Sequence, residues 1–200
     1  VHADFYRLSE DMDYVVPMAP DASRSQRSRR AAPLKTAILD LSKGLPCFRV
    51  VEPLTGANSS LQYTAVVGYS SRIDGREETI KFEVGLREPL LQDACNRRAA
   101  TVLVDPVSRE PAVSPIPLRC MSLQESIAEK FRAALTRREV AARDFFDIDY
   151  AVRRLGIKPD DETLVDLIRR KLAVPGNAPA DVSPERFAAL RRQYRAQLEP

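Results

Sequence analysis

The chain has 200 residues, of which 44% are hydrophobic and 30% charged, and its formal net charge is +3. This is enough apolar sequence for one large domain, or for a domain with a helical appendage, so the chain is not expected to be disordered. No apolar run approaches the roughly 20 residues that span a bilayer, so we expect no membrane segment here. An odd number of cysteines without metal-ligand spacing favours the reducing cytoplasm over secretion.

The first part of the chain predicts a β-sheet with one helix. A short strand is expected at 11–16, followed by a polar, basic segment at 18–33 in which arginines gather between 24 and 30. That segment is either a mobile arm or the first turns of a helix broken at Pro33. Leucine and isoleucine at helical spacing predict an amphipathic helix at 34–45, which Gly44 would end. Further strands are expected at 47–53, 61–70, 79–86, 100–106 and 115–120, with a hairpin at the Asp-Gly pair in 72–77.

The last part of the chain predicts four helices, at 122–138, 140–156, 160–173 and 183–198. Ser122 with Glu125 forms a capping-box pattern, and Pro184 occupies the first position of the last helix. We therefore predict an α+β protein with a mixed sheet. Its sheet domain would span 1–120, with the basic segment at 23–30, and its C-terminal helical domain 121–200.

Two carboxylates stand out at the first strand. Asp11 and Asp13 are separated by one residue, so both point to the same side of a strand. Like charges this close repel each other unless a cation lies between them. Glu83, on the polar face of the strand at 79–86, is the candidate third acid for Mg²⁺ or Mn²⁺, which prefer oxygen ligands. The alternative is a strand end or a strand face that is simply solvated.

A second set of charged residues lies on the predicted helices. Lys130 borders the apolar stripe of the helix at 122–138. On the next helix Arg143 and Asp147 are four residues apart and share a face, with Asp144 beside them. The alternative is a pair of surface helices joined by ion pairs that each contribute little to stability.

Three segments carry a resemblance to a known family. "RLSEDMDYVV", "IKFEVGLRE" and "SLQESIAEKFRAALTRREVAARDFFDIDYAV" follow one another between residues 7 and 156. In this order they resemble the nucleotidyltransferase AbiEii/AbiGii toxin family, whose pattern is R-x-S-x-D-x-D, a later acid-bearing strand, then E-K-x-x-A and R-D-x-x-D on two helices. The resemblance implies a nucleotidyltransferase-like fold and the toxin component of a bacterial toxin–antitoxin or phage-defence pair, with a cognate antitoxin.

The resemblance also implies roles for single residues. A nucleotide would pass from a nucleoside triphosphate to an acceptor hydroxyl, with tRNA or another RNA as acceptor. The residues implied in metal binding and catalysis are Asp11, Asp13 and Glu83. Those implied in nucleotide binding are Ser9, Lys130, Arg143, Asp144 and Asp147. Lysine suits a point contact to phosphate, whereas the residues of the R-D-x-x-D segment would shape the nucleotide pocket or lock the two helices together.

One family feature is missing from the sequence. The family carries a glycine-rich G-G-[ST] segment before the two acids, where a helix N-terminus holds the triphosphate. The sequence begins at Val1, ten residues before Asp11, without such a segment. We expect either that the N-terminal part of the fold is truncated, or that the chain is a degenerate, inactive relative that binds nucleic acid or protein.

Two arginine-rich segments fit a nucleic-acid partner. Arginines at 23–30, and Arg191, Arg192 and Arg195 in the last predicted helix, suit contacts to a phosphate backbone. The alternatives are a solvated arm and an amphipathic helix that exposes its arginines.

Overall fold

The computed structural model describes residues 11–72, 74–99, 101, 103–175, 177 and 179–198. The chain divides into two compact units, one spanning Arg7–Pro89 and the other beginning at Leu90 and continuing to Pro200. The boundary therefore falls at residue 89, whereas the sequence places it after residue 120. The difference arises because two short strands between residues 95 and 120 cluster with the helices.

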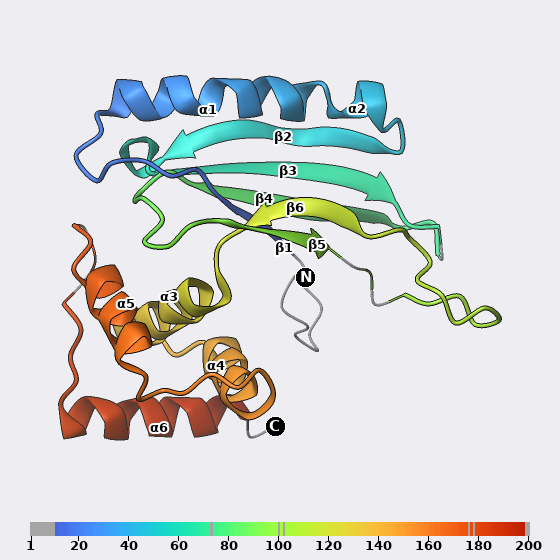
Figure 1. Cartoon of the computed structure of the whole chain (residues 1–200). Helices are drawn as coiled ribbons and strands as arrows, with labels where there is room; N and C mark the ends of the chain where they lie inside the picture. The colour runs from blue at the N-terminus through green and yellow to red at the C-terminus, as the bar shows by residue number, and fades with distance from the viewer. Residues whose placement is uncertain are drawn as a thin grey trace. The chain divides into compact units, whose positions relative to one another are not determined.

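The unit Arg7–Pro89 is built on a four-stranded mixed sheet, drawn in Figure 1. Its strands are β1 (Asp11–Val15), β2 (Phe48–Ala57), β3 (Gln62–Ser70) and β4 (Glu77–Gly85), in the spatial order β1-β4-β3-β2. β1 runs parallel to β4, and the other neighbours are antiparallel. All four strands and the hairpin between β3 and β4 were predicted. β2 continues farther than predicted, up to a 3-10 turn at Asn58–Ser60.

The basic segment is not a mobile arm, because it forms the first turns of helix α1 (Arg24–Leu39). Ser23 and Gln26 form a capping box at its start, which satisfies two backbone N–H groups that would otherwise lack acceptors. Pro33 lies inside the helix without ending it. The prediction that the helix begins at residue 34 was therefore wrong, because a strong cap upstream and packing against the sheet outweigh the hydrogen bond lost at one proline. A short helix, α2 (Leu41–Gly44), follows and ends at the predicted glycine.

Helix α1 lies along one face of the sheet, and the core of this unit forms between them (Figure 1). Strand alternation directs Tyr63, Ala65 and Val84 to that face, where they pack with Ala31 of α1. Arg27 is also buried there, and its guanidinium donates hydrogen bonds to the carbonyls of Leu86 and Pro20. One arginine of the basic segment thus supports the fold.

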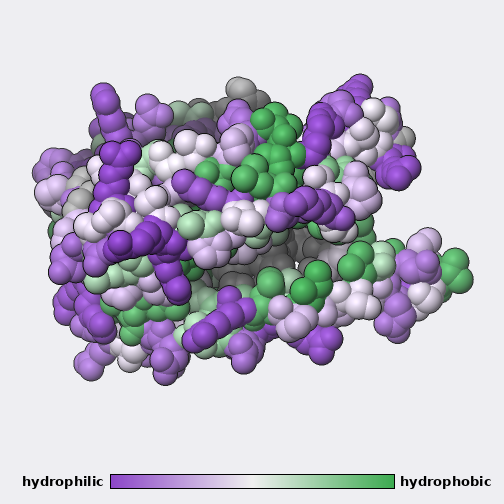
Figure 2. All heavy atoms as spheres, turned by 90° about the horizontal axis from the view of Figure 1, so that it is seen from above, coloured by the Kyte–Doolittle hydropathy of each residue, from purple (hydrophilic) through white to green (hydrophobic). Residues whose placement is uncertain are grey.

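The remaining arginines of this segment are available to solvent. Arg24, Arg29 and Arg30 are exposed on α1. Figure 2, which looks down on the side where α1 lies, shows hydrophilic side chains spread over the surface with smaller hydrophobic areas between them.

The second unit begins with a two-stranded antiparallel sheet, β5 (Cys95–Ala99) and β6 (Ile116–Cys120). β6 was predicted, but the strand predicted at 100–106 was wrong. Among the described residues of that stretch, Val104 forms only an isolated bridge with Pro111. The apolar residues at 102–104 have the composition of a strand. However, β6 pairs with the polar sequence "CNRRA" that precedes them, because strand formation depends on the available pairing partner more than on composition.

Four helices follow, as predicted: α3 (Leu123–Thr136), α4 (Ala142–Arg154), α5 (Glu162–Leu172) and α6 (Pro184–Leu198). The hydroxyl of Ser122 accepts the backbone N–H of Glu125 and caps α3. The core of this unit contains Ile127, Ala128, Ala151, Leu164 and Leu167. Of the helices in the described residues, none has the length and apolar character to cross a membrane.

Candidate functional site

The predicted acids lie on one face of the sheet. In the parallel pairing of β1 with β4, Asp13 is the register partner of Glu83, and Asp11 is the partner of Lys81. Because alternate residues of a strand share a face, Asp11, Asp13 and Glu83 all lie on the face opposite to α1. We call these three residues the acidic face. The structure therefore places on one face the acids that the sequence singles out.

A lysine that the sequence analysis did not single out lies among these acids. Lys81 forms an ion pair with one oxygen of Glu83, and the side-chain amide of Gln62 donates to the other oxygen at 3.3 Å. The hydrogen bond to Glu83 raises the pKa of Lys81, and the charges of Glu83, Asp11 and Asp13 raise it further. The acidic face thus already attracts one cation. Strand alternation next to Glu83 is the signal that could have identified Lys81.

The donor set of the acidic face suits a hard divalent cation. Its carboxylates offer only oxygen, the ligand atom that Mg²⁺ and Mn²⁺ prefer. Across the described parts of the chain, no three His, Cys, Asp or Glu side chains converge closely enough to form a metal site as they stand. Glu83 would therefore have to exchange the ammonium of Lys81 for the metal. Both side chains are partly exposed, Lys81 to 47% and Glu83 to 29%, so the ion pair contributes little to stability and this exchange costs little.

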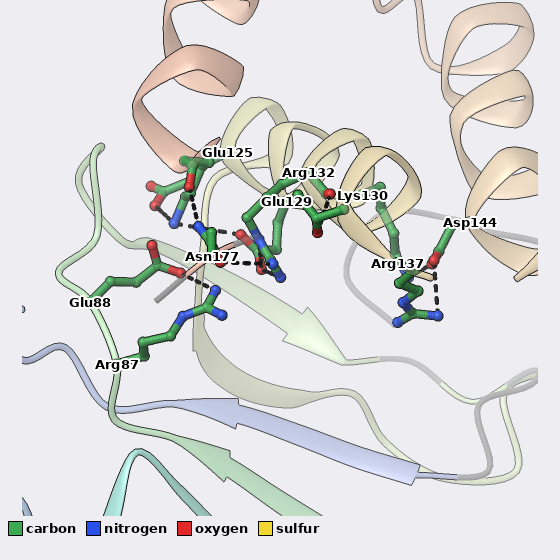
Figure 3. A network of polar contacts seen from close by, with 11 residues as sticks. Arg87, Glu88, Glu125, Glu129, Lys130, Arg132, Arg137, Asp144 and Asn177 are labelled. Carbon is green, nitrogen blue, oxygen red and sulfur yellow. Dashed lines mark hydrogen bonds and ion pairs between the residues drawn. The ribbon is translucent and has the colours of Figure 1, made fainter. Parts of the chain in front are cut away.

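The helical unit assembles a second charged cluster, which we call the Lys130 cluster. Lys130 on α3 lies between two carboxylates of α4, with Nζ 3.5 Å from Asp144 Oδ1 and 3.0 Å from Asp147 Oδ2. The other oxygen of Asp144 is 3.0 Å from Nη1 of Arg137, as Figure 3 shows for Lys130, Arg137 and Asp144. The cluster consists of Lys130, Arg137, Asp144 and Asp147.

Burial explains the arrangement of the Lys130 cluster. Asp144 is 1% exposed and Asp147 is 2% exposed, whereas about a third or more of Lys130 and Arg137 reaches solvent. Buried carboxylates without a cation would be strongly destabilising, so these ion pairs join α3 to α4. The aspartates in turn hold the two cations in place, with part of each side chain facing water. The cluster therefore joins the two helices, with part of each basic side chain in contact with solvent.

Not every predicted residue belongs to a cluster. Arg143 is exposed, whereas Asp147, one turn later, is buried against Lys130. Although Arg143 and Asp147 are four residues apart on one helix, the first is in solvent and the second is buried. Ser9 lies outside the described residues. Arg137 was missed by the sequence analysis, although it follows Lys130 by seven residues and so falls on the same side of α3.

Comparison with known proteins gives the family. The chain is similar to the solved structure of MenT4, a nucleotidyltransferase toxin from Mycobacterium tuberculosis H37Rv, with 16% identity and a TM-score of 0.52. The match covers 94% of this chain but only 66% of MenT4, just under two thirds, and at this identity it shows the fold alone. No curated protein matches the chain. The family described as "Nucleotidyl transferase AbiEii toxin, Type IV TA system" matches residues 1–200. The chain therefore belongs to the AbiEii nucleotidyltransferase toxin family.

Proposed function

We propose that this protein is a metal-dependent nucleotidyltransferase that acts as the toxin of a bacterial toxin–antitoxin pair in the cytoplasm. It would transfer a nucleotide from a nucleoside triphosphate to an acceptor hydroxyl of tRNA or another RNA, and a cognate antitoxin would oppose it. The observation that carries the proposal is the register of β1 and β4, which sets Asp13 opposite Glu83 with Asp11 on the same face.

The acidic face would hold the catalytic cation. Bound there, Mg²⁺ or Mn²⁺ would supply positive charge that activates the acceptor hydroxyl and stabilises the departing pyrophosphate. Asp11 and Asp13 would fix its position from β1, and Glu83 from β4. The acceptor oxygen would form the new bond to the α-phosphorus, pyrophosphate would leave with the electrons of the broken bond, and the hydroxyl would give its proton to solvent water.

The Lys130 cluster would bind phosphate. Lys130 and Arg137 each keep part of the side chain in solvent, while buried aspartates hold their positions. A cation fixed in this way loses little conformational entropy when it binds an anion. We propose that Lys130 contacts the phosphates of the nucleotide as a point charge and that Arg137 adds a second contact. Asp144 and Asp147 would act through these cations rather than on the nucleotide.

The second candidate is an inactive relative that binds RNA. Two observations favour it: Lys81 neutralises Glu83, and the exposed arginines Arg191, Arg192 and Arg195 line a pocket on α6 together with Phe187. Such a protein would retain RNA without modifying it.

One experiment separates the two functions. The protein is incubated with total RNA, Mg²⁺ or Mn²⁺, and each of the four α-labelled nucleoside triphosphates in turn. We expect incorporation by the wild-type protein and by the control Asp21→Ala, and none by the folded double variant Asp11→Ala/Asp13→Ala. Incorporation by the double variant would show that the metal assignment is wrong. RNA retained on a filter by the wild type without incorporation of any nucleotide would support the binding protein instead.

A further inference from the structure

Two of the three cysteines face each other across the small sheet. Cys95 on β5 is the register partner of Cys120 at the end of β6, and both side chains are partly buried. Register partners in antiparallel strands have Cα atoms about 4.5–5.5 Å apart. A disulfide joins Cα atoms that are about 4.4–6.8 Å apart, so the backbone already has the spacing of a cross-strand disulfide.

The side chain of Cys95 lies against the backbone that contains Cys120. Sγ of Cys95 is 3.6 Å from the carbonyl oxygen of Cys120 and 3.7 Å from that of Met121, so this side chain is directed to the partner strand. Burial raises the pKa of the Cys120 thiol, and the neighbouring Cys95 raises it further. Sγ of Cys120 is 3.9 Å from the carbonyl oxygen of Leu118 in its own strand, so a disulfide requires this side chain to turn towards Cys95.

Contacts just outside the strand pair fix the spacing of its two chains. The carboxylate of Glu125 accepts the backbone N–H groups of Leu91 and Gln92, each at 2.9 Å. The side chain of Gln92 contacts Ser122 and, at 3.3 Å, Gln124. The segment before Cys95 is thus tied to the start of α3, directly after Cys120. These contacts hold the two chains together next to the register pair of Cys95 and Cys120.

We propose that Cys95 and Cys120 are a thiol–disulfide site, which forms a reversible intramolecular disulfide with a low-molecular-weight disulfide such as oxidised glutathione as oxidant. One cysteine thiolate attacks a sulfur of oxidised glutathione, forms a mixed disulfide and releases one glutathione thiolate. The second cysteine thiolate then attacks the protein sulfur of the mixed disulfide and releases the second. Two electrons pass to the oxidant, and the two cysteine protons end on the two glutathione molecules.

The bond would close the segment 95–120 and anchor the start of α3. It would reduce the freedom of the unfolded chain, so the oxidised protein should unfold at a temperature about 5 °C higher than the reduced protein. Because the thiolate is the attacking species and the pKa of Cys120 is raised, oxidation should become faster as the pH is increased.

Peptide mapping of the whole chain tests the proposal. The protein is equilibrated with reduced and oxidised glutathione, free thiols are alkylated, and trypsin digestion is carried out without reduction. The tryptic peptides 88–97, 120–130 and 44–49 then each contain one cysteine. In the wild type, we expect 88–97 joined to 120–130 and 44–49 unlinked. In Cys47→Ser, the bond between 88–97 and 120–130 should still form. In Cys95→Ser and Cys120→Ser, the remaining thiol of the pair should carry glutathione instead.

Three results would overturn the proposal. The first is wild-type protein in which 88–97 and 120–130 carry glutathione or alkyl groups separately. The second is a bond from either peptide to 44–49. The third is a bond between molecules, which a mixture of isotope-labelled and unlabelled protein reveals. The decisive map uses the wild type, so it does not depend on the folding of the serine variants.

Discussion

Asp13 on β1 and Glu83 on β4 are register partners across two parallel strands that lie far apart in the sequence. Their carboxylates are therefore fixed on one face by backbone pairing rather than by a loop. A site held on strands keeps its geometry better than one held on loops. Lys81, two residues before Glu83 on the same strand face, forms an ion pair with it. The acidic face thus takes its carboxylates from both strands and has one lysine beside them.

Replacement of Glu83 by glutamine should weaken binding of a divalent cation. The substitution removes the charge and one oxygen donor but preserves the shape of the side chain. Since loss of even an outer-shell partner costs about 10- to 100-fold in metal affinity or activity, we expect nucleotide transfer to fall by at least about 100-fold. Titration with Mn²⁺, followed by electron paramagnetic resonance, measures the binding directly. The control Glu78→Gln, an exposed residue of the same strand, should bind Mn²⁺ as the wild type does. Equal affinity in Glu83→Gln would remove Glu83 from the site.

Replacement of Lys81 by methionine should have the opposite effect on the metal. The ammonium of Lys81 competes with a cation for Glu83 and repels a cation near Asp11 and Asp13. In a solvated site, a unit charge a few ångströms away changes the binding of a cation by about 1 kcal/mol, so removal of this charge should raise Mn²⁺ affinity by about 3- to 10-fold. Lys43→Met, at another exposed ion pair of the same unit, is the matched control and should leave Mn²⁺ binding unchanged. A fall in Mn²⁺ affinity in Lys81→Met would show that Lys81 organises the acids rather than competing with the metal.

The sequence predicts the faces of β1 and β4 because strand alternation is local. It cannot predict that these strands pair in parallel, since their register depends on contacts between distant segments. Strand alternation places Lys81 on the face of Glu83, but its closeness to Asp11 is a consequence of pairing and required the structure. The faces of the two strands were thus predictable, whereas the closeness of Lys81 to the acids of β1 was not.

The helices could also be predicted from the sequence only where the signal lies within one element. Capping residues and apolar stripes predict the helices of the second unit well, because both signals act within one element. The start of α1 was left open between a mobile arm and a helix broken at Pro33, because the capping box at Ser23 precedes a segment without an apolar stripe. The ion pairs of Asp144 and Asp147 also required the structure, since burial distinguishes them from the exposed Arg143.

The pKa of Tyr14 predicts a small change in stability at alkaline pH. Burial raises the pKa of this half-exposed phenol, so the folded state favours the protonated form. The stability it contributes is complete below the pKa of tyrosine in the unfolded chain, about 10, and is lost as the pH rises through the higher folded value. Urea unfolding between pH 9 and 11 should therefore show a steeper loss of unfolding free energy in the wild type than in Tyr14→Phe. Parallel curves would contradict the prediction.

A pair of substitutions in the Lys130 cluster should separate stability from nucleotide binding. Lys130→Met alone leaves Asp147 buried without the ammonium 3.0 Å away, so we expect a loss of about 2–3 kcal/mol of unfolding free energy. The double variant Lys130→Met/Asp147→Asn removes both charges and should recover most of that loss. It should still bind a nucleoside triphosphate at least about 10-fold more weakly than the wild type, because a charged contact to phosphate is missing. Calorimetric titration with each triphosphate measures this, and wild-type affinity in the stable double variant would remove Lys130 from the binding site.

The strongest stability effect should come from Glu125, whose side chain is fully buried. Its carboxylate lies 2.8 Å from Nζ of Lys171, which is 1% exposed, and it also accepts two backbone N–H groups; Figure 3 shows Glu125 within this network. Glu125→Gln leaves the lysine charge buried with a weakened partner, so we expect a loss of about 3–5 kcal/mol of unfolding free energy.

Urea denaturation measures this change as a shift in midpoint at constant slope. The exposed control Glu139→Gln should stay within about 0.5 kcal/mol of the wild type. Glu125→Gln/Lys171→Met removes the buried charge, so it should be more stable than Glu125→Gln alone, although one backbone N–H still lacks its carboxylate acceptor. If Glu125→Gln loses less than about 1 kcal/mol, solvent reaches Lys171 and the pair is not buried in solution.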